Sequence, residues 1–194
     1  MNRPLPRRFF ARPTTLVARE LLGKVLAFGG ASGIIVETEA YLDKDDGAAH
    51  FARGMTPRTE VIYGPPGHAY VYFIYGMYDC VNVVTEADGV AGAVLIRALE
   101  PLAGIEAMRR RRPTARRDED LANGPGKLTR ALGIKVAHNG VDLTKGPIAI
   151  HQPQHAGPFE IAVTPRIGIR KSADLPLRFF IKGNRFVSRV KMKV

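Results

Sequence analysis

Cysteine is almost absent from the chain, which has Cys80 alone among its 194 residues. A single cysteine excludes an intramolecular disulfide and a cysteine-based zinc cluster, and it fits a reducing compartment. The five histidines are scattered, and none has the spacing of a metal-binding motif such as HExxH. The sequence therefore predicts neither a disulfide-stabilised secreted protein nor a metal site.

Long hydrophobic runs are also missing. No apolar stretch approaches the ~18 residues that a membrane-spanning helix requires. The arginine-rich N-terminus lacks the apolar core of about 7–15 residues that secretory signal peptides carry. We therefore expect no membrane association and no targeting segment. If the chain is bacterial, a cytoplasmic protein associated with the nucleoid is expected.

Acidic residues are scarce relative to basic ones. The chain has 18 Asp and Glu against 29 Lys and Arg, which leaves a formal net charge of +11. A surplus of this size is typical of proteins that bind a polyanion, usually nucleic acid. Charge alone leaves a merely soluble basic protein equally open. Hydrophobic residues make up 45% of the chain, as in an ordinary globular domain.

Length and residue patterns predict one α+β domain over residues 1–194, with flexibility expected at residues 1–13 and 189–194 and in the charged segment "RRPTARRDED". Apolar periodicity indicates strands at residues 24–28, 34–41, 69–74, 79–85 and 93–99, with shorter strands after residue 141. Helices are expected at residues 13–23, capped by Thr14 or Thr15 and ended by Gly23, from Pro101 to the arginines at 109–112, and after residue 124. These elements predict a curved, mainly antiparallel sheet with a protruding β-hairpin and a few peripheral helices.

The strand "IIVETEAY" places two acids beside an aromatic residue. Side chains alternate between the faces of a strand, so Glu37, Glu39 and Tyr41 are expected on one face and Ile34, Val36 and Thr38 on the other. The pattern alone favours a solvated sheet surface. The chemical alternative is a carboxylate that activates water or stabilises positive charge on a sugar, beside a ring that holds a flat substrate.

The stretch "YVYFIYGMY" predicts a hairpin with an unusual tip. Turns usually carry small polar residues, but here Tyr75 and Met77 flank Gly76. An exposed ring with nothing to bury it is suited to inserting into something else. We therefore predict that Tyr75, backed by Met77, is a wedge that enters DNA and fills the gap left by a flipped nucleotide. For Tyr70 and Tyr78 a place in the core is preferred.

Several motifs in one order resemble the alkyladenine (3-methyladenine) DNA glycosylase family. They are "IVETEAYL", "DGAAH", "TPR", "YVYFIYGMYDCVNVV", "LIRALEP", "GPGKLTRALGI", "RIGI" and "LPLRFFIKGN". The resemblance extends from about residue 15 to residue 188. It implies an enzyme with a compact mixed α/β fold that excises alkylated or deaminated purines from DNA with no metal or other cofactor. The expected partner is double-stranded DNA carrying damaged purines, and the protein is expected to act as a monomer without lyase activity.

The same resemblance implies roles for individual residues. Glu39 matches the general base that activates water for attack on the sugar C1′, and Arg97 matches an arginine that helps to position this water. Glu37 has no catalytic counterpart and is expected to be structural. The remaining matches are the base-pocket residues Tyr41, His50, Tyr72 and Asn82, and the intercalating Tyr75.

Basic residues outside these motifs have less specific interpretations. Arg58 in "TPR" and Lys127 in "NGPGK" are predicted to contact DNA phosphates. The segment "NGPGK" fits either a phosphate-binding turn at a helix start or the hairpin of helix-hairpin-helix proteins. The arginines at 109–112 fit a solvated helix end.

Two other functions remain open from the residues alone. One is a non-catalytic nucleic-acid binder that uses its basic face and Tyr75 as a stacking platform. The other is a carbohydrate hydrolase that uses Glu37 and Glu39, whose spacing of roughly 6.6 Å along a strand lies near the range of inverting enzymes. A binder has no use for a carboxylate among tyrosines, and a carbohydrate hydrolase has no use for the basic charge and the wedge.

Overall fold

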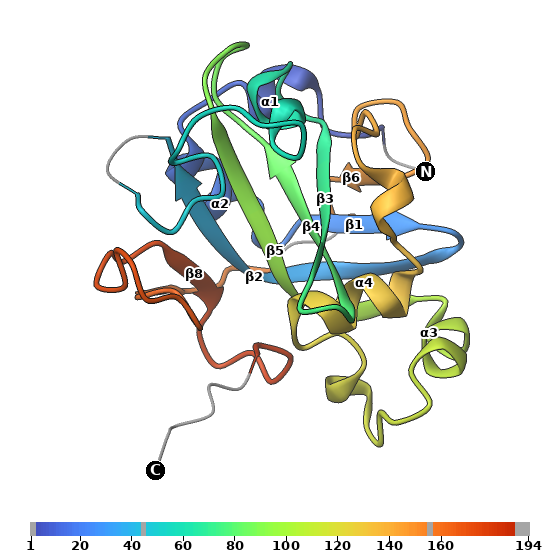
Figure 1. Cartoon of the computed structure of the whole chain (residues 1–194). Coiled ribbons are helices and arrows are strands. Elements are labelled where there is room, and N and C mark those ends of the chain that lie inside the picture. Colours follow the sequence, from blue (N-terminus) through green and yellow to red (C-terminus); the bar gives the residue numbers. More distant parts are fainter. Residues whose placement is uncertain (1–2, 44–45, 155–156, 189–194) are drawn as a thin grey trace.

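A curled antiparallel sheet organises the fold (Figure 1). The computed structural model describes residues 3–43, 46–154 and 157–188. Within them the strand order is β3-β4-β5-β2-β1-β6, with β8 paired to β2 and β7 paired to β8. The strands are β1 (Val25–Phe28), β2 (Ala31–Leu42), β3 (Ala69–Ile74), β4 (Tyr78–Val84), β5 (Gly92–Ala103), β6 (Ala149–His151), β7 (Ile161–Thr164) and β8 (Arg178–Ile181). The predicted α+β domain with a curved antiparallel sheet is confirmed.

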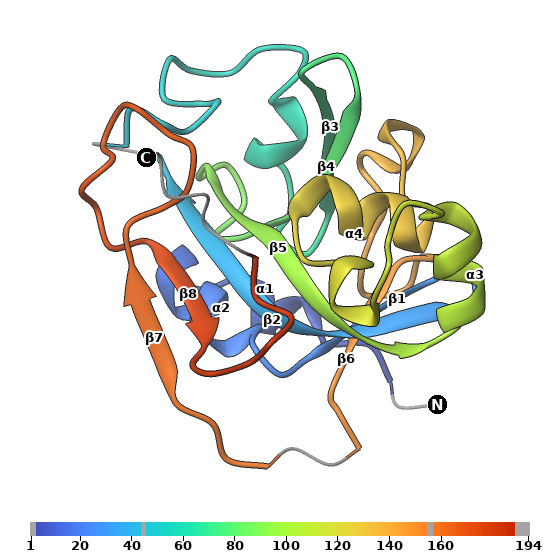
Figure 2. The ribbon, with the colours of Figure 1, turned by 90° about the horizontal axis from the view of Figure 1, so that it is seen from below.

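Short helices cover parts of this sheet (Figures 1 and 2). They are α1 (Arg7–Phe10), α2 (Thr14–Glu20), α3 (Ile105–Arg111) and α4 (Pro125–Leu132), with single 3₁₀ turns at Glu60–Tyr63, Asp118–Asp120 and Val136–His138. Helix α4 packs against β4 and β5, α3 packs against α4, and α2 packs against β2. Among the described residues, no helix is long and apolar enough to cross a membrane.

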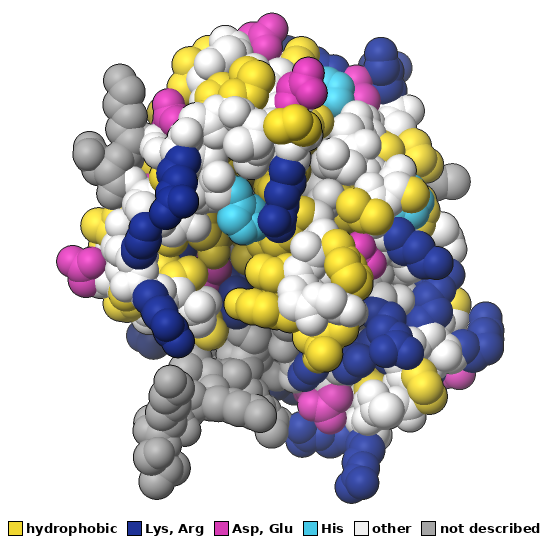
Figure 3. All heavy atoms as spheres, in the orientation of Figure 1, with side chains coloured by type: hydrophobic (Ala, Val, Ile, Leu, Met, Phe, Trp, Pro, Cys, Tyr) yellow, Lys and Arg dark blue, Asp and Glu magenta, His cyan; other side chains and the backbone are white. Residues whose placement is uncertain are grey.

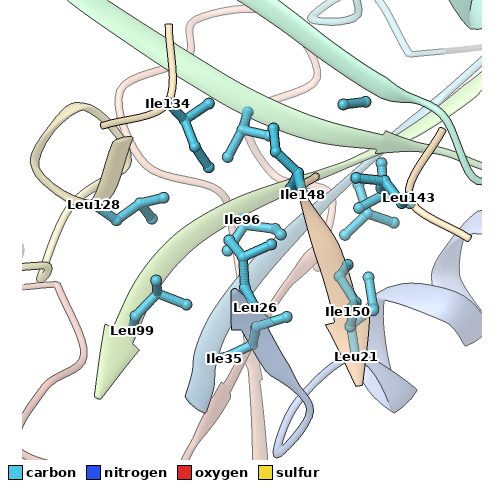
Figure 4. Packing of buried hydrophobic residues seen from close by; sticks show 14 of the residues in the cluster. Leu21, Leu26, Ile35, Ile96, Leu99, Leu128, Ile134, Leu143, Ile148 and Ile150 are labelled. Atoms are coloured by element: carbon cyan, nitrogen blue, oxygen red, sulfur yellow. The ribbon is translucent and has the colours of Figure 1, made fainter. Parts of the chain in front are cut away.

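The main core lies between the sheet and these helices (Figure 4). Leu21 at the end of α2, Ile96 from β5 and Leu128 from α4 are fully buried in the same cluster. The N-terminal segment contributes Leu5 and Phe10 to it. Alternating Val, Ile and Leu positions on the strands supply one side of the core, and the apolar sides of α2 and α4 supply the other.

Two local irregularities change the expected faces of β2. Against β5, strand β2 holds one extra residue at Val36, and β5 holds one extra residue at Arg97 immediately afterwards. A bulge shifts the alternation of side chains. Thr38 therefore faces α2, where its hydroxyl donates to the carbonyl of Ala18 at 2.8 Å, whereas Ile34 and Val36 belong to a separate apolar cluster. The prediction that these three side chains share a face is wrong.

The starts of two helices also differ from expectation. Strand β5 continues through Pro101 to Ala103, and α3 begins only at Ile105. The proline is accommodated because it lies near a register shift toward the end of the ladder, where a missing N–H costs little. Thr14 is the first residue of α2 rather than a cap, and its hydroxyl contacts Thr85 and Glu86 instead of the helix backbone.

Glu37 ties several elements together. Its carboxylate is buried, and Oε1 accepts hydrogen bonds from Arg178 Nε at 2.6 Å and Arg97 Nε at 3.1 Å. Ser188 donates two further hydrogen bonds of 2.8 Å, from its hydroxyl to Oε1 and from its backbone N–H to Oε2. The side chain therefore joins β2, β5, β8 and the segment that follows β8. Its burial contradicts the solvated surface favoured by the sequence pattern.

Glu37→Gln is expected to destabilise the protein strongly. Removing one partner of a buried ion pair leaves an uncompensated charge, here on Arg178, at a cost of about 3–5 kcal/mol. Urea unfolding followed by circular dichroism measures the free energy of unfolding. The matched control is Glu160→Gln, which removes an exposed partner of Lys182 and should cost less than about 1 kcal/mol. Equal stability of the two variants would contradict the structural role of Glu37.

Candidate functional site

A cavity of about 360 Å³ opens beside the β3–β4 hairpin. Its walls come from the loop after β2, strands β3, β4 and β5, the start of α4 and residues 167–169. Figure 3 shows apolar side chains and a histidine gathered around a hollow on this face of the molecule. The lining brings together six residues that the sequence singled out: Tyr41, His50, Tyr72, Tyr75, Asn82 and Arg97.

Aromatic groups packed against one another form one wall of the cavity. The ring centroids of His50 and Tyr72 lie 4.5 Å apart and those of Tyr70 and Tyr72 5.2 Å apart. His50 Nδ1 lies 3.2 Å from the Tyr70 hydroxyl. Burial raises the pKa of Tyr70 and Tyr72, and burial together with nearby Arg58 lowers the pKa of His50. The wall is therefore aromatic and neutral at pH 7.

Glu39 lies behind the cavity rather than in its lining. Its carboxylate is fully buried, and three hydrogen-bond donors contact it. Oε1 accepts from the backbone N–H of Ile167 at 2.8 Å, and Oε2 accepts from the Tyr41 hydroxyl at 2.9 Å and Arg97 Nη1 at 3.2 Å. The three residues that donate these bonds all line the cavity, so a single layer of residues separates Glu39 from it. The carboxylate has a fixed orientation.

Arg97 lies between the two buried acids, because its Nε contacts Glu37 while its Nη1 contacts Glu39. Burial alone lowers the pKa of Arg97, but the carboxylates of Glu39 and Glu37 more than offset this and raise it. The guanidinium therefore stays charged in the interior. Its position at the irregularity of β5 directs it toward both acids of β2.

Tyr41 is supported by a pair that the sequence did not reveal. The guanidinium carbon of Arg166 lies 4.6 Å from the Tyr41 ring centroid. Arg166 forms a bidentate ion pair with Asp46, with two contacts of 2.6 Å and both side chains fully buried. This pair joins the loop after β2 to the segment after β7. Both residues stand inside quoted motifs, "DGAAH" and "RIGI", but nothing in those motifs indicates that they meet.

The hairpin tip matches its predicted exposure. The side chain of Tyr75 is 77% exposed and that of Met77 is 65% exposed. Tyr75 and Gly76 both have positive φ, at 54° and 67°, as the central residues of a tight hairpin turn require. A tyrosine in this backbone region is uncommon, and the residue also borders the cavity. The tip therefore holds an aromatic ring in solvent at the rim of the hollow.

Of the two tyrosines expected in the core, one is there and one is not. Tyr70 is 2% exposed, as predicted, but Tyr78 is 44% exposed and the prediction for it is wrong. Strand β4 begins at Tyr78, one residue earlier than expected, and the ring lies over the start of α4. A Cβ at Gly126 would approach this ring to 2.6 Å, so glycine permits the close packing.

The two residues predicted to contact phosphates lie in different settings. The Arg58 guanidinium carbon is 5.1 Å from the Tyr72 ring centroid, beside the aromatic wall. Lys127 lies in the first turn of α4 and donates to Asn123 Oδ1 at 2.7 Å. Neither lines the cavity. Their role as phosphate contacts stays a prediction. Among the described residues, no group of His, Cys, Asp and Glu could hold a metal ion.

The comparisons with known proteins are consistent with one another. A family model described as Methylpurine-DNA glycosylase (MPG) matches residues 8–185. A protein of Rhodopseudomonas palustris (strain HaA2) is 56% identical over 95% of this chain and 90% of that protein. One of Burkholderia lata is 53% identical with the same coverage, and one of Methanoculleus marisnigri is 51% identical over 95% of this chain and 98% of that protein. All three are named "Putative 3-methyladenine DNA glycosylase".

The single cysteine offers a direct probe of the cavity. Cys80 lines it but is only 5% exposed, and burial raises the pKa of its thiol to about 11. Alkylation by iodoacetamide requires the thiolate. In the folded protein the rate should therefore be slow and should still rise about tenfold per pH unit between pH 7 and 9.5. In the urea-unfolded control the rate should level off above about pH 8.5. A plateau near pH 8.5 in the folded protein would contradict this environment for Cys80.

Proposed function

Since the chain belongs to the methylpurine-DNA glycosylase family, it is a DNA repair hydrolase that cleaves N-glycosyl bonds, and we propose that it flips damaged purines out of duplex DNA and releases them with a water activated by Glu39. The resemblance seen in the sequence is confirmed by this membership. It favours the first of the three functions that the residues left open. The substrates we propose are purines alkylated at N3 or N7, or deaminated purines such as hypoxanthine.

One observation carries the proposal. An aromatic cavity of about 360 Å³ lies directly in front of a buried, oriented carboxylate, and an exposed tyrosine stands at its rim. An enzyme reaches the bond between a base and its sugar only after the base leaves the stack, which requires a pocket to receive the base and benefits from a group to replace it. The cavity would receive the base, Glu39 would activate the water, and Tyr75 would replace the base in the stack.

The pocket suits a flat cation. Tyr41 and Tyr72 are neutral phenols, because burial raises the pKa of both and the Glu39 carboxylate raises that of Tyr41 further. A neutral aromatic face attracts a positively charged ring. A purine alkylated at N3 or N7 carries such a charge, whereas an undamaged purine does not. Stacking between these rings therefore favours an alkylated purine over an undamaged one.

The chemistry needs few groups, because a cationic purine is already a good leaving group. A new bond forms between the water oxygen and the sugar C1′ while the bond from C1′ to the purine nitrogen breaks and its electron pair leaves with the base. Glu39 accepts the proton of the water, and its negative charge stabilises the oxocarbenium-like sugar. Ile167 N–H, Tyr41 and Arg97 fix the carboxylate in one orientation. Such preorganisation avoids the cost of reorienting it during the reaction.

An abasic site is the proposed product. A glycosylase that also cuts the strand uses an amine that forms a Schiff base with the sugar. The described residues that line the cavity include no lysine. We therefore propose a monofunctional enzyme.

Glu39→Gln is expected to abolish base release while DNA binding is retained. The amide keeps the shape of the side chain but cannot accept the proton of the water, and loss of a general base typically costs 10²–10⁴-fold in rate. Single-turnover excision from a duplex with one hypoxanthine or 7-methylguanine, followed by alkaline cleavage, measures the rate per folded molecule.

The matched control for this variant is Glu160→Gln, an exposed acid that lies outside the cavity. It should excise at the parental rate. If Glu39→Gln stayed within about tenfold of the parent, a barrier change of only ~1.4 kcal/mol, Glu39 would not be the general base. A parent protein that released none of the damaged bases would overturn the substrate assignment itself.

Tyr75→Asn should weaken binding to a duplex that carries a paired lesion and leave the fold intact. Asparagine tolerates the positive φ of this position, so only the ring is removed. Unstacking a base costs a few kcal/mol, of which the inserted ring recovers part. The defect should shrink when the lesion is mispaired, because a mispaired base is easier to flip.

Phe73→Asn provides the control, since Phe73 is a half-exposed aromatic residue on the same hairpin that does not line the cavity. Binding and excision are compared on paired and mispaired duplexes, with a thermal melt of each variant. Equal defects in Tyr75→Asn and Phe73→Asn, or a defect that is the same on both duplexes, would contradict the wedge.

A further inference from the structure

A second, more basic hollow adjoins the candidate site. This hollow, the α3–α4 groove, has a volume of about 670 Å³ and lies between the end of α3, helix α4 and the hairpin tip. Arg110, Arg111, Arg130 and Lys135 line it, together with Met77 and Tyr78 of the hairpin. Figure 3 shows Lys and Arg side chains gathered over α3 and α4, on the same face as the first hollow.

The four cations of the groove lack acidic partners within the described part of the chain. The nearby acids of the α3 region are engaged elsewhere: Glu106 and Asp118 pair with Arg109, and Asp120 pairs with Arg117. Asp79 also lines the groove, where its carboxylate accepts the backbone N–H of Val136, so one negative charge stands against the four cations. The groove therefore carries a net positive charge that the protein itself does not neutralise.

Backbone contacts hold part of this charge in place. Arg111 Nη1 donates to the carbonyl of Ala131 and Arg130 Nε donates to the carbonyl of Arg111, both at 3.0 Å. These bonds use one donor of each guanidinium and leave the others for a ligand. Burial and the charge of Arg130 both lower the pKa of neighbouring Arg112. The like charges are thus close enough to repel, and a bound anion would relieve this repulsion.

The groove is continuous with the candidate site. Tyr78 and Gly126 line both hollows, and Met77 stands at the tip between them. A strand whose nucleotide enters the first cavity at Tyr75 would carry its next phosphates past Met77 toward α3 and α4. We propose that the α3–α4 groove binds backbone phosphates of the DNA strand next to the flipped nucleotide. This assignment rests on the proposed function.

The proposal changes the interpretation of the arginines at 109–112. Arg109, which is half exposed and paired with two acids, fits the solvated helix end that the sequence indicated. Arg110 and Arg111 instead face the groove. Phosphate is the expected ligand because guanidinium groups match its geometry and because the groove opens beside the DNA-reactive cavity.

The test is the salt dependence of binding by Arg110→Gln/Lys135→Gln. Both side chains are exposed and neither forms an ion pair within the described part of the chain, so the fold should be unaffected. Each lost phosphate contact reduces the slope of log K against log salt by about 0.9, so the double variant should lose about 1.8. Affinity for an undamaged 20-base-pair duplex at 0.1 M salt should then fall on the order of 10–100-fold.

The control is Lys145→Gln/Lys182→Gln, which removes the same charge from exposed positions that line neither hollow. An equal loss of slope in the control, or an unchanged slope in the groove variant, would overturn the proposal. Polyglutamate of matched charge is the second probe. Equally tight binding of polyglutamate in the groove would overturn the assignment to phosphates. The slope is measured on undamaged DNA, so it does not depend on base release. Absence of base release by the parent protein would overturn only the proposed function.

Discussion

Arg97 holds together two carboxylates that the fold buries on adjacent positions of one strand face. Without it, Glu37 and Glu39 would repel each other in a region with little water, which is costly for both. The arginine contacts each of them, at 3.1 and 3.2 Å. The two acids then differ in what else surrounds them. Glu37 is fixed by Arg178 and Ser188 on the structural side, whereas Glu39 is fixed by groups that line the cavity.

The cavity exists because contacts between distant segments support its walls. Asp46 and Arg166 are 120 residues apart, yet their bidentate pair joins the loop after β2 to the segment that supplies Ile167. The same arginine packs on the Tyr41 ring, so Tyr41 is held by Arg166 and by its hydroxyl bond to Glu39. A ring fixed at two points can receive a stacked base without first losing rotational freedom.

The sequence predicts this site unevenly, and the reasons are physical. The alternation of side chains and the tip "YGM" are local signals, so the strands, the hairpin and the exposure of Tyr75 could be inferred. Bulges leave no clear local signal, so the predicted faces of Ile34 and Val36 were wrong. The solvated surface expected for the two acids was wrong because Ile167, Arg178 and Ser188, all distant in the sequence, contact their carboxylates. The pairing of Asp46 with Arg166 depends on tertiary structure alone. The prediction for Tyr78 was wrong because the burial of a strand residue depends on how fully another element covers it. The start of α4 contacts the Tyr78 ring but leaves the residue 44% exposed.

Charge is also divided between the interior and the surface. The buried charged residues of the described chain are Glu37, Glu39, Asp46, Arg97, Arg166 and Arg178. These are three acids and three arginines, so the interior is balanced and the whole surplus of +11 belongs to the other residues. Attraction of a polyanion therefore does not depend on the groups that orient Glu39. Because the two sets are separate, substitutions on the surface can change DNA affinity and its salt dependence without disturbing the buried network beside the cavity.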